Sequence, residues 1–108
     1  MHITELFESM PGRLNPEAAA GMNKTLQWNI TGEDAGVWAM QINNGEGVLI
    51  PGGVENPDVT FTISAKHWLS IAEGKLDGMK AFMTGKLKVA GDMTLGMKMS
   101  QLFPTQNQ

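Results

Sequence analysis

The stretch that decides the fold is GKLKVAGDMTLGMKM, residues 85–99. Within it, Leu87 and Val89 alternate with lysines, which is the period of a strand with one buried face. This alternation predicts a strand over residues 86–90. The glycine that follows permits a tight turn, and the aspartate after it can cap the amide groups at the start of a helix. We therefore expect a strand, a turn and a terminal helix.

The expected terminal helix, residues 92–103, carries apolar side chains on two faces. Met93 and Met97 lie on one stripe, well round the helix from a second stripe. A helix packed on a single sheet needs only one apolar stripe. The methionine stripe therefore requires another apolar partner, either a ligand or another protein surface. The stripe that we expect to face the core consists of Leu95, Met99, Leu102 and Phe103.

Hydrophobic periodicity and capping residues predict the elements that precede this stretch. The pattern places helices at residues 3–10, ended by a Pro-Gly pair, and at residues 16–20. Two further helices are expected between Ser64 and Gly74 and between Asp77 and Gly85. Alternating apolar residues predict strands at 24–31, 37–42, 48–50 and 59–64.

The order of these elements indicates an α+β fold formed by one domain, residues 1–108. Its helices are expected to cover one face of a single, mostly antiparallel sheet. The connection from strand 59–64 to strand 86–90 is long enough for a crossover, so we expect one pair in the sheet to be parallel. Residues 104–108 are polar and are expected to fray.

Charge and composition exclude several classes of function. The net charge of −3 argues against nucleic acid as a partner, and the absence of cysteine excludes disulfides and thiol chemistry. Residues 1–63 carry two basic and eight acidic side chains, whereas residues 64–108 carry six lysines and three acidic ones. We see no signal peptide and no run long enough to span a membrane. The mildly basic half could contact an anionic surface transiently.

Catalytic and metal-binding motifs are not apparent in the sequence. The two histidines, His2 and His67, have no serine or cysteine nucleophile motif beside them. The carboxylates lack the spacing of metal ligands, and no glycine-rich phosphate loop is complete. We expect no catalytic residue, no metal and no cofactor, and therefore not an enzyme.

Blocks of sequence between Asn56 and Phe103 resemble the sterol-carrier-protein-2-like domain family. They occur in the order and at the separation typical of that family. Before Asn56 the resemblance rests on a helix followed by a meander, with Trp28, Trp38 and an Asn-Gly hairpin turn. The blocks are PDVTFTIS (57–64), GKL (74–76), AFM (81–83), GKLKV (85–89), GDM (91–93) and MKM (97–99).

The resemblance implies a five-stranded sheet covered by helices that encloses a hydrophobic tunnel for sterols, fatty acids, acyl-CoA or phospholipids. It implies no catalytic residues. The terminal helix would help to close the tunnel, which would give Met93 and Met97 a partner. Family members that travel to peroxisomes end in a small-basic-leucine tripeptide, whereas this chain ends in Gln-Asn-Gln. We therefore expect a cytoplasmic protein.

The hypothesis is a non-enzymatic lipid-binding or lipid-transfer protein, holding an acyl chain, acyl-CoA or a sterol-like lipid. The alternative is a dimerisation or interaction module that uses the methionine-rich C-terminal surface without lipid. Lys86, Lys88 and Lys98 are candidates for a rim that holds an anionic head group. The expected cavity lining is Trp28, Trp38, Met40, Phe61, Trp68, Leu69, Met79, Phe82, Met83, Met93, Leu95, Met97, Met99, Leu102 and Phe103.

Overall fold

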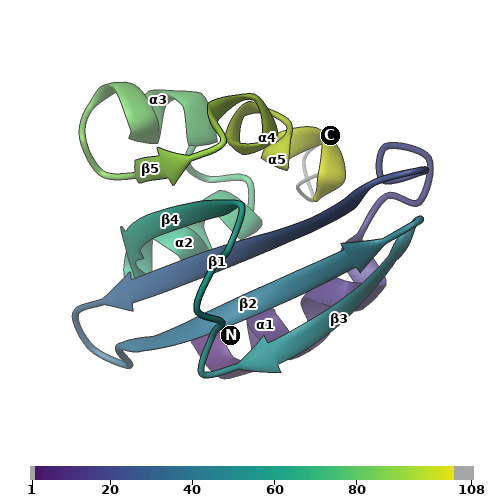
Figure 1. Cartoon of the computed structure of the whole chain (residues 1–108). Coiled ribbons are helices and arrows are strands. Elements are labelled where there is room, and N and C mark those ends of the chain that lie inside the picture. Colours follow the sequence, from purple (N-terminus) through teal and green to yellow (C-terminus); the bar gives the residue numbers. More distant parts are fainter. Residues whose placement is uncertain (1, 104–108) are drawn as a thin grey trace.

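A computed structural model describes residues 2–103, which form one open five-stranded sheet with short helices (Figure 1). The strand order is β3-β2-β1-β4-β5. This arrangement confirms the α+β class. The strands are β1 (Asn23–Thr31), β2 (Gly36–Asn43), β3 (Glu46–Pro51), β4 (Val59–Ser64) and β5 (Lys88–Gly91). The helices are α1 (Ile3–Arg13), α2 (Ala65–Ala72), α3 (Gly78–Met83), α4 (Met93–Met97) and α5 (Met99–Leu102).

The sheet is mixed because β1 and β4 run parallel, with Leu26 opposite Val59. The other three pairs are antiparallel, including β4 with β5. The expectation of one parallel pair is therefore confirmed, although the long connection from β4 to β5 is not the one that forms it. One helix after β4 would return the chain to the start of that strand, but α3 reverses the direction once more (Figure 1). The chain consequently enters β5 beside the end of β4, where Lys88 pairs with Thr62, and the two strands run antiparallel.

The core lies between the sheet and the helices that cover one of its faces. Trp28, Phe61 and Phe7 are fully buried there. Large apolar side chains alternate along β1 and β4 with polar ones that lie on the opposite face. On that opposite face, Thr25 donates a hydrogen bond of 2.6 Å to the side chain of Gln41. One face of the sheet is therefore apolar and covered, and the other is polar.

Helix α1 continues through Pro11 to Arg13, three residues beyond the predicted end. Proline removes one backbone donor from the last turn of this helix. The last turn gains other bonds, because Ser9 Oγ donates to Leu6 O at 2.7 Å and Arg13 Nε donates to Ser9 Oγ at 3.0 Å. Buried Leu14 then anchors the chain where the helix ends.

The predicted helix at residues 16–20 is a series of turns. One helical hydrogen bond is present, from Ala19 N to Asn15 O at 3.1 Å, and the side chain of Asn15 accepts from Glu17 N at 3.1 Å. One turn forms too few hydrogen bonds to offset the conformational entropy that is lost when a helix nucleates. The segment therefore does not extend into a helix.

The terminal helix is divided into α4 and α5 at Lys98, whereas the sequence predicts one helix over 92–103. The two halves are anchored to different parts of the fold. Asp92, which caps α4, donates its own amide to Asp58 O at 2.8 Å, next to β4. Leu102 O, at the end of α5, accepts from Asn15 N at 2.8 Å, next to α1. Residues 104–108 lie outside the described residues.

Gly91 sets the path from β5 into α4. Its φ is +99°, and a Cβ at this position would lie 2.6 Å from the carbonyl oxygen of Asp58. Only glycine fits such a close approach without strain. The expected turn at this glycine is therefore confirmed, although β5 begins at Lys88 and not at the predicted residue 86.

Candidate functional site

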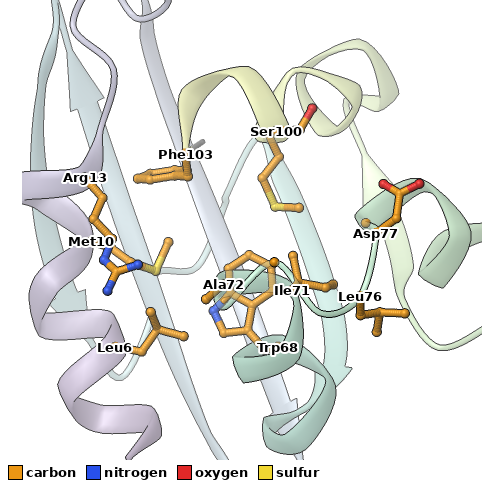
Figure 2. Close-up of a pocket in the computed structure, with 13 residues that line it drawn as sticks. Leu6, Met10, Arg13, Trp68, Ile71, Ala72, Leu76, Asp77, Ser100 and Phe103 are labelled. Carbon is orange, nitrogen blue, oxygen red and sulfur yellow. The ribbon is translucent and has the colours of Figure 1, made fainter. Parts of the chain in front are cut away.

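Two apolar pockets lie between the helices on the covered side of the sheet. We call the larger one, about 300 Å³, the Trp68 pocket (Figure 2). It is lined by Leu6, Met10, Arg13, Trp68, Ile71, Ala72, Gly74, Leu76, Asp77, Gly78, Met99, Ser100 and Phe103. We call the smaller one, about 140 Å³, the Phe82 pocket. It is lined by Asp77, Gly78, Met79, Phe82, Leu87, Val89, Met93, Gly96, Met97, Met99 and Ser100.

The lining of the Trp68 pocket comes from α1, α2, α3 and α5 and from the segment between α2 and α3. On α1, Leu6, Met10 and Arg13 follow one another at intervals of four and three residues, so they share one face of the helix. Trp68 on α2 faces them across the pocket, and Phe103 covers the end near Arg13 (Figure 2). The walls are therefore apolar, with one cation at the α1 side.

The Phe82 pocket lies under α3 and α4. Its inner wall includes Leu87, which is buried, and Val89 of β5. Its outer wall consists of side chains that are substantially exposed, with Met97 at 65% and Met79 at 47%. This pocket is therefore mostly apolar, with Asp77 and Ser100 as its polar residues, and it is bordered by flexible methionines that can adapt to ligands of different shape.

The two pockets adjoin each other. They share Asp77, Gly78, Met99 and Ser100 as lining residues. The side chain of Met99 is only 6% exposed and is the sole large apolar group of the four. An unbranched thioether with several rotatable bonds is well suited to such a boundary, since it can change rotamer at little cost.

Polar groups in the Trp68 pocket lie on its α1 side and at Asp77. Arg13 is half-buried and forms no ion pair among the described residues. The carboxylate of Asp77 accepts a hydrogen bond from Met79 N at 3.3 Å and caps α3. Trp68 Nε1 is buried and has no hydrogen-bond partner within residues 2–103. A buried unpaired N–H is costly, and Trp28 Nε1 in the core is in the same state within residues 2–103.

The structure brings seven of the predicted lining residues to the pockets. Trp68, Met99 and Phe103 line the Trp68 pocket, and Met99 also lines the Phe82 pocket with Met79, Phe82, Met93 and Met97. Of the others, Trp28, Met40, Phe61, Leu95 and Leu102 are buried in the packed core. Trp38 stacks on Phe7, Met83 is 76% exposed, and Leu69 borders a polar cleft beside Glu33.

The predicted rim lysines, Lys86, Lys88 and Lys98, are exposed and line neither pocket. The cation at the larger pocket is instead Arg13, which sequence reasoning missed. The sequence did indicate this position, because Arg13 continues the helical stripe that includes Leu6 and Met10. The indication was overlooked because the helix was predicted to end at residue 10. Ile71 and Leu76 were also missed, because single apolar residues near a helix end fit a core equally well.

The fold is a mixed sheet with one helical layer and two adjoining, mostly apolar pockets. The sequence matches the SCP-2 sterol transfer family over residues 3–104, and the chain belongs to this family. At the level of the family, the domain is one of lipid binding and transfer.

Relatives with this domain include larger proteins. Peroxisomal multifunctional enzyme A of Dictyostelium discoideum is 39% identical over 107 residues, 94% of this chain and 24% of that protein. Hydroxysteroid dehydrogenase-like protein 2 of Danio rerio is 32% identical over 104 residues, 94% of this chain and 25% of that protein. The chain therefore spans about a quarter of these relatives.

Solved structures share the fold over the whole domain. Palmitated SCP2L2 of Aedes aegypti has a TM-score of 0.77 at 23% identity, covering 96% of each chain. In residues 2–103, no helix is long and apolar enough to cross a membrane. No group of three or more His, Cys, Asp or Glu side chains in the same part could hold a metal ion.

Proposed function

We propose that this chain is a non-enzymatic lipid-binding protein that holds one acyl-chain lipid across its two pockets. The observation that carries this proposal is the adjacency of the pockets, which share Met99 and three small or polar residues in their lining. The polar end of the lipid lies at Arg13, and its acyl chain extends past Met99 into the Phe82 pocket.

Apolar burial supplies the affinity. The Trp68 pocket, at about 300 Å³, is at the lower end of the sizes typical of small-molecule sites. Each methylene removed from water contributes about 0.8 kcal/mol, so ten buried methylenes give roughly 8 kcal/mol. Ordering the chain and the flanking side chains reduces this gain. A long acyl chain therefore gains more binding free energy from two adjoining pockets than a compact ligand does.

Arg13 and Trp68 determine which end of the lipid enters the larger pocket. A guanidinium group binds a carboxylate through two parallel hydrogen bonds, and Arg13 has no competing carboxylate partner among the described residues. Trp68 Nε1 adds a buried donor without a partner. A fatty acid therefore fits better than a sterol-like lipid, which has a hydroxyl group and no negative charge. Acyl-CoA would place its carbonyl there and its nucleotide outside.

Displacement of a fluorescent fatty acid from the delipidated protein tests this proposal. Palmitate should displace the probe, and native mass spectrometry of the protein before delipidation should detect one bound lipid. Absence of both signals would refute lipid binding. Palmitate and cholesterol used as competitors in parallel report which chemical class the pockets prefer.

The exposed methionines favour a second candidate, an interaction module that dimerises through α3 and α4. Met83 and Met97 are 76% and 65% exposed, and exposed apolar surface often marks a protein interface. Sedimentation velocity distinguishes this candidate, since a dimer that Met97→Glu dissociates, with no lipid in either form, would support it.

The cytoplasmic location and the single domain over residues 1–108 stay predictions.

A further inference from the structure

Exposed large apolar side chains are concentrated on one face of the molecule. Six such side chains occur in residues 2–103, and five of them lie on α3 and α4, the exception being Val48. We call this face the docking face. In Figure 1 these two helices lie together at the edge of the fold beside β5, away from α1. The docking face consists of Met79 (47% exposed), Phe82 (41%), Met83 (76%), Met93 (44%) and Met97 (65%).

The charges around the docking face are mainly positive, although Asp77 and Asp92 cap its two helices. Residues 78–103 carry four lysines and one aspartate. That aspartate, Asp92, accepts a hydrogen bond from Leu95 N at 3.1 Å, and its carboxylate lies 3.9 Å from Lys24 Nζ. The rest of the described chain, residues 2–77, carries ten acidic and four basic side chains. An anionic surface would therefore attract α3 and α4 and repel the remainder of the molecule.

We propose that the docking face binds the surface of an anionic lipid bilayer. Apolar side chains surrounded by lysines are the composition of segments that lie at a membrane interface. A second copy of the chain fits less well, because it would bring the same lysines opposite one another. The acidic remainder of the molecule would orient the protein on approach, with α3 and α4 toward the lipid.

The docking face coincides with the entrance of the Phe82 pocket. Four of its five residues, all except Met83, also line that pocket. A lipid could therefore pass from the bilayer into the pocket between the methionines without crossing water. This part of the inference rests on the proposed lipid binding, whereas attachment to the bilayer does not.

Met83→Glu tests the docking face without changing either pocket, because Met83 lines neither. The matched control is Val48→Glu on β3, where the replaced side chain is 61% exposed. Binding is measured by cosedimentation with vesicles of phosphatidylcholine and phosphatidylserine, and with vesicles of phosphatidylcholine alone. We expect the wild-type protein and Val48→Glu to bind the anionic vesicles. Met83→Glu should bind them about tenfold or more weakly.

Lysine substitutions test the electrostatic part. Lys80→Gln on α3 should weaken binding to anionic vesicles by about fivefold, and Lys66→Gln on α2 should leave it unchanged. Both lysines are exposed, so neither substitution disturbs the core. Added salt should reduce the difference in vesicle binding between the wild-type protein and Lys80→Gln, because salt screens exposed charges.

Three results would overturn the inference. These are absence of wild-type binding to anionic vesicles, equal binding by Met83→Glu and Val48→Glu, and loss of a dimer in Met83→Glu with vesicle binding unchanged. The same proteins are tested in parallel for displacement of the fluorescent fatty acid in solution. If that displacement is normal while vesicle binding fails, the docking face is refuted and lipid binding stands. If vesicle binding follows the docking face while displacement fails, lipid binding is refuted.

Discussion

Phe7 of α1 lies parallel to Trp38 of β2, with ring centroids 4.6 Å apart and 4° between the ring planes. The same phenyl ring contacts Trp28 at 5.6 Å and Trp68 at 6.4 Å between centroids. Offset aromatic pairs add about 0.5–1.5 kcal/mol each beyond their apolar burial. Phe7 thus connects α1 to the sheet and to α2, and it holds the α1 wall of the Trp68 pocket in place.

Phe7→Ala should lower the free energy of unfolding by about 3–5 kcal/mol, because it leaves a cavity among three tryptophans. Urea denaturation followed by tryptophan fluorescence measures the change. Trp38→Phe is the control, since it keeps a stacked ring in a half-buried position and should cost less. A loss below about 1 kcal/mol in Phe7→Ala would contradict the role given to this ring.

Gly91→Ala should destabilise the fold by more than about 1 kcal/mol, because its φ is positive and its Cβ would meet the Asp58 carbonyl. Gly12→Ala is the matched control. No heavy atom lies within 4 Å of a Cβ at Gly12, and alanine favours a helix by up to about 1 kcal/mol. Thermal unfolding of the two variants should therefore shift in opposite directions. Equal melting temperatures would contradict the close approach at Gly91.

Arg13→Gln should weaken binding of palmitate by about tenfold to a hundredfold, the contribution of a hydrogen bond to a charged group. Binding of methyl palmitate should change much less, because the ester has no negative charge. Lys88→Gln, an exposed residue outside both pockets, should bind both ligands as the wild-type protein does. Fluorescence displacement measures the affinities of the three proteins for the two ligands, and an equal loss of acid and ester in Arg13→Gln would count against Arg13 as the head-group site.

Met99→Ala should join the two pockets and shift the preference toward longer acyl chains. The substitution should also lower the free energy of unfolding by about 2–5 kcal/mol, as truncation of a buried methionine does. Met40→Ala is the control, because Met40 is fully buried but lines neither pocket. Both variants should lose stability, and only Met99→Ala should change the order of affinities in a series of fatty acids. An unchanged order would show that Met99 does not separate the pockets.

Features encoded by neighbouring residues could be predicted from the sequence. The three expected helix caps are confirmed at Ser64, Asp77 and Asp92, whose side chains accept hydrogen bonds from His67, Met79 and Leu95 amides. The Asn44-Gly45 turn is confirmed as well, with φ of 48° and 88°. These features depend on local backbone geometry, which adjacent side chains determine. The meander β1–β2–β3 could be predicted in the same way, from this turn and from the alternating apolar residues of its strands.

Features set by distant partners could not be predicted. The break at Lys98 depends on two anchors, Asp58 and Asn15, that lie far from it in the chain. Periodicity identifies Phe61 and Trp68 equally as apolar, yet one is packed in the core and the other lines a pocket. The difference depends on which segment covers each side chain. A single sequence does not encode that information locally.

The parallel pairing of β1 with β4 joins parts of the chain that are 33 residues apart, as the bond of 2.8 Å from Thr25 N to Asp58 Oδ2 shows. Such contacts form late, because the entropy of closing a long loop must be lost first. The meander can form early, whereas α5 gains its anchor only when Leu102 reaches Asn15. We therefore expect a chain emerging from the ribosome to form the meander before the pockets. The proposed lipid would then be loaded only after synthesis has passed α5.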